Sequence, residues 1–162
     1  MDFPGFCQAV QTTWIYRMMQ PTWVFPVVET IHLSAMVLMV GSITVFDLRL
    51  LGVAFRRYSV SQIAEHLLPS TWTGFATMLV TGTLLFATTP VQKYCPNSAF
   101  RFKLVMIVVA GLNMSVFHFT VYRKVAEWDK ASATPLLAKM AGSLSVLLWG
   151  SVVVAGRMIG FY

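Results

Sequence analysis

The sequence predicts an all-α fold, an integral membrane four-helix bundle with an N-terminal interfacial helix. Of the 162 residues, 57% are hydrophobic and 11% are charged, and the mean hydropathy is +0.69. A chain with that composition cannot keep its surface in water. Four segments, at about 23–46, 70–89, 102–122 and 140–159, reach the roughly 20 apolar residues that a hydrocarbon core requires. They leave no room for a separate soluble domain.

The chain begins with a segment that suits the membrane surface. In residues 6–19, Val10, Trp14 and Met18 recur at helical spacing with polar residues between them. A basic leader followed by an uninterrupted apolar stretch is missing, so we do not expect a cleavable signal peptide. We therefore expect residues 1–22 to form an interfacial amphipathic segment and residues 23–162 to form the bundle.

The positions of Lys and Arg predict the orientation. The first and third loops carry Arg49, Arg56, Arg57, Arg123, Lys124, Lys130 and Lys139. The opposite side carries Arg17, Lys93, Arg101, Lys103 and Arg157. This bias favours the first and third loops in the cytoplasm, with both termini on the periplasmic side of a bacterial inner membrane. The surplus positive charge suits anionic lipid and needs no nucleic acid to explain it.

The predicted topology places both cysteines in an oxidising compartment. Cys7 lies in the leading segment and Cys95 in the loop between the second and third spans. They either form a disulfide that holds the leading segment over the bundle or remain free thiols.

The first span carries a line of polar and sulfur-containing residues at helical spacing. Glu29, His32, Met36, Ile43 and Asp47 fall near one stripe. Such a line must face protein or a cavity rather than lipid. The carboxylates of Glu29 and Asp47 lie close to the span ends, where a solvated or salt-bridged side chain is the default expectation.

The other spans offer space as well as ligands. On the third span, Gly111 precedes Met114 and His118 on one stripe and leaves out a side chain where a flat ligand could lie. The second span has a face of small residues that either permits close helix approach or leaves space for a bulky group: Ser70, Gly74, Thr77 and Thr81. In the fourth span, Gly142 and Trp149 can close the bundle.

The histidines admit two cofactor interpretations. The first is haem b, one or two per chain, with axial imidazoles from His32, His66 and His118. In this interpretation Arg49 and Lys103 pair with the haem propionates at the membrane surface. Four-helix bundles build cofactor sites from facing helices in this way.

The second cofactor interpretation is a Cu(I) site. Imidazole and thioether suit a soft monovalent ion. His32 with Met36, and Met114 with His118, are pairs four residues apart on one helix face. Against this, methionines in a membrane chain mostly fill gaps in the packing.

Depth distinguishes the three histidines. At about 1.5 Å per residue, His32 lies about a third of the way in from the outer face, and His118 lies within about two turns of the inner face. His66 precedes Pro69 near the inner surface. His66 and His118 are therefore the better-matched pair, and His32 serves a separate outer site, alone or with a methionine.

Two runs of the sequence carry a resemblance to known families. They contain ETIHL at 29–33 and FDLRLLG at 46–52, then FRFKL at 100–104 and FH at 117–118. From Trp23 onward the chain resembles small bacterial four-span membrane proteins that are similar in layout to the cytochrome b561 and copper-resistance-D membrane families. The resemblance implies histidine-ligated b haems and electron transfer between a carrier and a quinone or other acceptor. It makes His32, His66 and His118 ligands, with a fourth histidine missing.

These observations together predict a membrane haem b protein for electron transfer, a component of a membrane oxidoreductase. The predicted partners are the lipid bilayer and a quinone or protein redox partner. A different class is a non-catalytic structural subunit of a larger membrane complex, and a third is a Cu(I)-binding or transport protein. A nucleophilic triad, a phosphate-binding loop and zinc-ligand spacing are missing from the sequence, which argues against a hydrolase or a nucleotide enzyme.

Overall fold

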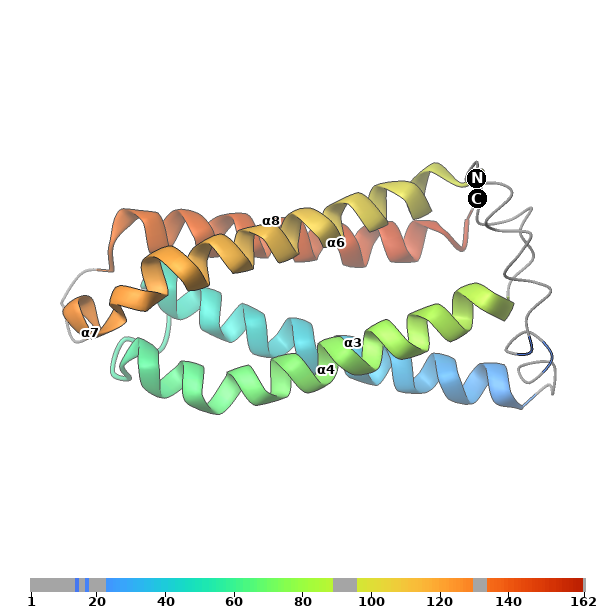
Figure 1. The fold of residues 1–162 in the computed structure, drawn as a ribbon, viewed down its shortest axis with the longest axis horizontal. Helices are drawn as coiled ribbons and strands as arrows, with labels where there is room; N and C mark the ends of the chain where they lie inside the picture. Colours follow the sequence, from blue (N-terminus) through green and yellow to red (C-terminus); the bar gives the residue numbers. More distant parts are fainter. Residues whose placement is uncertain (1–13, 15–16, 18–22, 89–95, 130–133, 162) are drawn as a thin grey trace.

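The computed structural model describes residues 14, 17, 23–88, 96–129 and 134–161. Its long helices are α3 (Val24–Leu51), α4 (Val60–Thr88), α6 (Ser98–Val116) and α8 (Leu136–Met158). Three short elements continue α6 without a break: η1 (Phe117–Val121), η2 (Tyr122–Lys124) and α7 (Val125–Trp128). The predicted all-α fold is confirmed (Figure 1).

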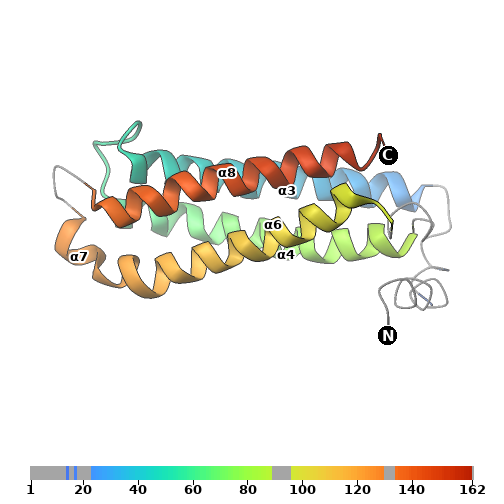
Figure 2. The same cartoon turned by 90° about the horizontal axis from the view of Figure 1, so that it is seen from above.

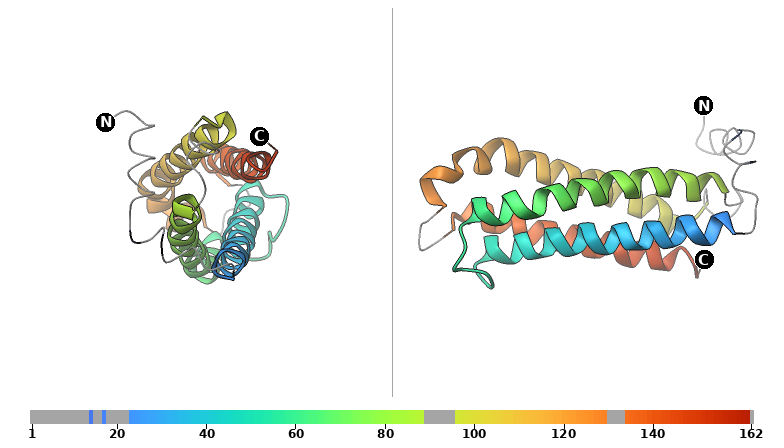
Figure 3. Two further views of the ribbon diagram at one scale, coloured as in Figure 1. Left: turned by 90° about the vertical axis from the view of Figure 1, so that its right-hand side faces the viewer. Right: turned by 90° about the horizontal axis from the view of Figure 1, so that it is seen from below.

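The long helices run up and down as two packed pairs. The closest packing is within α3–α4 and within α6–α8, and α3 joins the pairs by packing on α8. Seen end-on, the four helices surround a common axis (Figure 3), and the same arrangement is seen from above in Figure 2. We call the end where α3 begins and α8 ends the terminal end, and the end where α7 lies the loop end (Figure 1).

Three helical segments are long and apolar enough to cross a membrane: Val24–Leu51, Ser98–Trp128 and Leu136–Met158. The chain is therefore a membrane protein. Helix α4 is as long but less apolar because threonines occupy much of its length. The hydroxyls of Thr71, Thr73, Thr77, Thr81 and Thr83 each donate to the carbonyl one turn back. These polar groups are thus satisfied inside the helix, which suits a segment beside lipid.

The connection between α3 and α4 is shorter than the sequence predicted. We expected residues 47–69 to connect the spans, whereas α3 continues to Leu51 and α4 already begins at Val60. Local capping explains both limits. Gly52 ends α3 in the left-handed conformation, with φ of 70°. Ser59 and Gln62 cap the start of α4 reciprocally, each side chain accepting from the other residue's backbone N–H.

Close helix approach builds the core. A Cβ added at Gly74 of α4 would lie 2.9 Å from the Cβ of Met39, so the predicted small-residue face is confirmed at this position. Met39 and Trp149 are buried in the central cluster, at 1% and 7% exposure. Toward the loop end, Gly142 of α8 lies against Leu50, where its missing Cβ would be 3.3 Å away. The predicted closure of the bundle by Gly142 and Trp149 is confirmed.

A surface carboxylate ties the two helix pairs together at the loop end. Asp129, which follows α7, accepts from the backbone N–H of Ser61 at 2.9 Å and from the Ser61 hydroxyl. Partial burial raises the pKa of Asp129, but the hydrogen bonds from Ser61 and its neighbours outweigh this and lower the pKa below its usual value. Asp129 therefore caps the first turn of α4 as a carboxylate.

Three predictions lie outside the described residues. These are the interfacial helix over most of residues 1–22, the position of Cys7 and the position of Cys95. The disulfide accordingly stays a prediction.

Candidate functional site

Polar side chains gather inside the apolar bundle at two levels. One level, which we call the terminal layer, contains His32, Thr81 and Lys103. The other is a cavity toward the loop end that contains Asp47 and His118, which we call the loop-end cavity. The prediction that His32 and His118 lie at different depths is confirmed.

The terminal layer holds an imidazole in a defined state. The half-buried His32 of α3 contacts Thr81 of α4, with 2.8 Å between Nδ1 and Oγ1. The single hydroxyl hydrogen of Thr81 goes to the carbonyl of Thr77, at 2.7 Å. When that hydrogen lies on the Thr77 carbonyl, Thr81 offers a lone pair, and the matching tautomer of His32 carries its hydrogen on Nδ1 and donates it. The lone pair of the neutral ring is then on Nε2.

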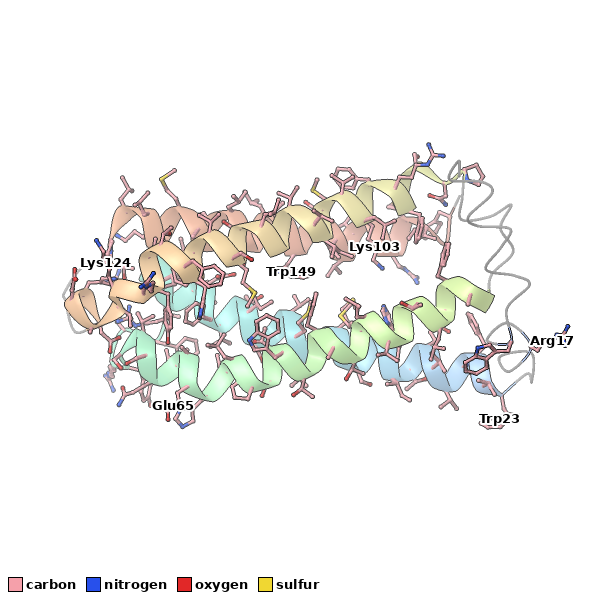
Figure 4. All side chains as sticks on the ribbon, viewed as in Figure 1. Arg17, Trp23, Glu65, Lys103, Lys124 and Trp149 are labelled. Atoms are coloured by element: carbon pink, nitrogen blue, oxygen red, sulfur yellow. The ribbon has the colours of Figure 1, made fainter. Side chains whose placement is uncertain are left out.

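Two glycines make room for these side chains. A Cβ at Gly82 would lie 3.3 Å from Cε1 of His32, and a Cβ at Gly156 would lie 3.3 Å from Nζ of Lys103. Lys103 points into the space between the helix pairs (Figure 4) and lies in the same layer as His32. Among the described residues, no carboxylate forms a salt bridge with Lys103. The terminal layer therefore offers positive charge and a nitrogen lone pair without an anion.

The loop-end cavity has a volume of about 70 Å³ and lies where the four long helices meet. Its polar lining comes from Asp47 of α3, Thr71 of α4, Asn113 of α6 and Ser145 of α8, together with His118 and Tyr122. The remaining lining is aliphatic, aromatic or methionine. No lysine or arginine side chain lines it.

Asp47 is the most unusual residue of this cavity. Its side chain is only 3% exposed, and its Oδ2 has no hydrogen-bond partner. Ser145 supplies a hydrogen bond to the carboxyl group. The expectation of a solvated or salt-bridged Asp47 is wrong, because α3 continues one turn past it and α8 packs over it, with Gly142 close to the Asp47 carbonyl.

His118 reaches the same cavity from an irregular stretch of helix. It lies in the π-helical turn η1, and its ring stacks on Tyr122 with 5.5 Å between centroids. The side chain is exposed overall, so only part of the ring faces the cavity. A π-helical turn changes the direction of the side chains it contains and often marks a functional position.

The other predicted site residues, His66, Arg49 and Gly111, are not among the residues that line the loop-end cavity. His66 is exposed, and its Nδ1 is 2.8 Å from the carbonyl of Gln62 in its own helix. The guanidinium of Arg49 donates to the carbonyl of Tyr58 at 2.8 Å. Gly111 is exposed, and an added Cβ there would meet nothing within 4 Å.

The predicted methionine ligands differ in position. Met36 is half-buried on α3, whereas Met114 lines the loop-end cavity together with His118. In the described part of the chain, no group of three or more His, Cys, Asp or Glu side chains could hold a metal ion.

The structure also adds residues that sequence reasoning missed. Gly82, Gly156, Asn113 and Ser145 all contact or line one of the two levels. A signal existed for Ser145, which lies between Gly142 and Trp149 at helical spacing on the α8 face that was expected to close the bundle. For the glycines, only knowledge of which helices are neighbours identifies the side chains opposite them.

Comparison with known proteins gives a family without an activity. Residues 19–162 match the family of unknown function DUF6644, and the chain belongs to this family. No curated protein matches the chain, and no solved structure does.

Proposed function

We propose that this member of DUF6644 is a haem b protein of the bacterial inner membrane that works in electron transfer, in which His32 would bind the haem iron. The observation that carries the proposal is the state of the His32 ring. In the tautomer that carries its hydrogen on Nδ1, the ring donates to Thr81 and keeps the Nε2 lone pair for a metal. Histidines that bind metals almost always donate their other ring N–H in this way.

The other residues of the terminal layer fit the same group. Gly82 lets α4 pack closely against the edge of the His32 ring, and Lys103 would supply a cation for a propionate carboxylate. Haem b supplies a one-electron iron couple when bound. In the proposal, His32 binds the iron, Thr81 fixes the ring, Lys103 balances negative charge and the apolar helices keep water away.

The positions of the histidines favour one haem per chain over two. His66 is exposed and bonded within α4, and it is not among the residues that line the cavity with His118. We therefore propose a single haem in the terminal layer. The Lys and Arg distribution supports placing this layer on the periplasmic side, with a quinone or a redox protein as the electron partner.

An absorption spectrum tests this function directly. Wild-type protein purified after expression with ample haem should show the Soret and alpha bands of haem b. His32→Ala should lose most of this haem, and His66→Ala is the matched control that removes an exposed histidine and should keep it. A colourless wild-type protein would overturn the proposal. Equimolar copper in that protein would then favour the Cu(I) alternative, and a protein without metal would favour the structural subunit.

A further inference from the structure

We propose that the loop-end cavity is a proton-binding site and that the Asp47 carboxyl group takes up the proton. This inference goes beyond electron transfer and does not depend on haem in the terminal layer. It rests on the position of one side chain, which is 3% exposed in a chain that spans a membrane, and on its Oδ2, which has no hydrogen-bond partner.

Among the described residues, no lysine or arginine side chain lines the cavity around Asp47 to balance a carboxylate charge. From α4 the cavity receives Leu67, Leu68 and Thr71, and from α8 it receives Ala141, Ser145 and Trp149. The titratable groups that face it are His118 and Tyr122, both from the continuation of α6. A buried carboxylate without a cation is costly, and such a group is normally neutralised by a proton.

The cavity provides partners for a protonated carboxyl group. Asn113 uses its amide nitrogen on the carbonyl of Ala141, at 3.1 Å, so its amide oxygen can accept a hydrogen bond from Asp47 or from water. The hydroxyl of Thr71 donates to the backbone carbonyl of Leu67, so its oxygen can accept a hydrogen bond in the cavity. A volume of about 70 Å³ holds about two water molecules at their liquid volume. The polar atoms of Asp47, Thr71, Asn113 and Ser145 lie together in a lining that is otherwise mostly apolar.

The proton reaches Asp47 from the loop end. His118 lines the cavity and is exposed on its other side, so it connects the buried carboxyl group with the surroundings of the bundle. In the uptake step, an O–H bond of a hydronium ion in the cavity breaks and an O–H bond forms at Asp47 Oδ2, which leaves a neutral carboxyl group and one water molecule.

Infrared spectroscopy of the full chain in lipid nanodiscs tests the proton-binding site. At neutral pH the wild-type protein should show the C=O stretching band of a protonated carboxylic acid, and the band should shift in D₂O. Asp47→Asn keeps the shape of the neutral group and should remove the band. Asp129→Asn, which changes a surface carboxylate that caps α4, should leave it in place. Loss of haem should not change this band, so the proton-binding inference can fail or succeed independently of the proposed function.

Isotope labelling covers the case in which Asp47→Asn does not fold. In Asp129→Asn protein labelled with ¹³C at the aspartate side-chain carboxyl, the remaining aspartates are Asp2 and Asp47. The band should then shift by the amount expected for the heavier carbon. Absence of an acid band at neutral pH, or a band that the label does not move, would overturn the inference. A carboxylate band that shifts when sodium is added would also overturn the inference. It would show that Asp47 binds a cation instead of a proton.

Discussion

The terminal layer and the loop-end cavity are both polar levels in one apolar bundle, but they have opposite chemistry. The terminal layer has an imidazole with its hydrogen engaged and a lysine, and no carboxylate. The loop-end cavity has a carboxylate with an unpartnered oxygen, and no lysine or arginine. About 22 Å of helix rise separates His32 from Asp47 along α3. The two levels therefore differ in the charge they would accept. Under the proposals above, the terminal layer would take an anionic cofactor and the loop-end cavity a proton.

The largest expected effect is a loss of stability when the core between the two levels is disrupted. Trp149→Ala removes a buried aromatic side chain that belongs to the central cluster and lines the loop-end cavity. We expect it to lower the free energy of unfolding by about 3 to 5 kcal/mol. Unfolding in mixed detergent micelles measures this. Trp72→Ala, at a tryptophan that is 54% exposed, is the control and should change stability far less. Equal losses for the two variants would contradict the assigned core.

The next effect concerns the terminal layer alone. Thr81→Val keeps the volume of the side chain but removes the oxygen that accepts from His32. Loss of such a supporting hydrogen bond should lower haem affinity about 10- to 100-fold. Thr83→Val makes the same change at an exposed threonine that bonds only its own helix, and haem titration should leave its affinity unchanged. A wild-type affinity in Thr81→Val would show that the hydrogen bond does not prepare the ligand.

A third test concerns the close contact between α3 and α4 at Gly74 and Met39. Gly74→Ala places a Cβ 2.9 Å from the Cβ of Met39, whereas Gly150→Ala meets nothing within 4 Å. The first should destabilise by about 1 to 3 kcal/mol through overpacking. The second should stabilise α8 by about 0.5 to 1 kcal/mol, since alanine favours helix more than glycine does. If both alanines stabilise, α3 and α4 are further apart than the structure has them.

The smallest effect lies at the surface of the loop end. Asp129→Ala removes the cap of α4 and should cost about 1 kcal/mol. Because folding lowers the pKa of Asp129, its contribution is fully present above the unfolded value, about 3.9, and is lost as the pH falls through the folded value. Stability measured from neutral pH down to pH 3 should therefore converge for wild type and variant. A constant difference across that range would contradict a carboxylate cap.

Much of the fold could be predicted from the sequence because apolar length and helical spacing are local properties. They gave the helical bundle, the small-residue contact at Gly74 and the different depths of His32 and His118. The helix limits were less accurate, since Gly52 and Ser59 set them by capping and not by hydropathy.

The two levels were harder to predict because they depend on which side chains face each other. Helical spacing placed Asp47 and His32 on one stripe but did not show that α8 covers the first or that Thr81 orients the second. Likewise, spacing put Gly111 in line with His118, whereas His118 lies inside the irregular turn η1 and Gly111 remains exposed in α6. Pairing between helices is a tertiary property that one sequence does not contain in readable form.

The central claim is that the two levels are separate sites, and the haem content of Asp47→Asn compared with His32→Ala tests it most directly. Both proteins are purified beside the wild type, and haem per chain is determined from the absorption spectrum. The account predicts wild-type haem in Asp47→Asn and little haem in His32→Ala. Loss of haem from a folded Asp47→Asn, with retention in His32→Ala, would contradict the account and move the cofactor to the loop-end cavity.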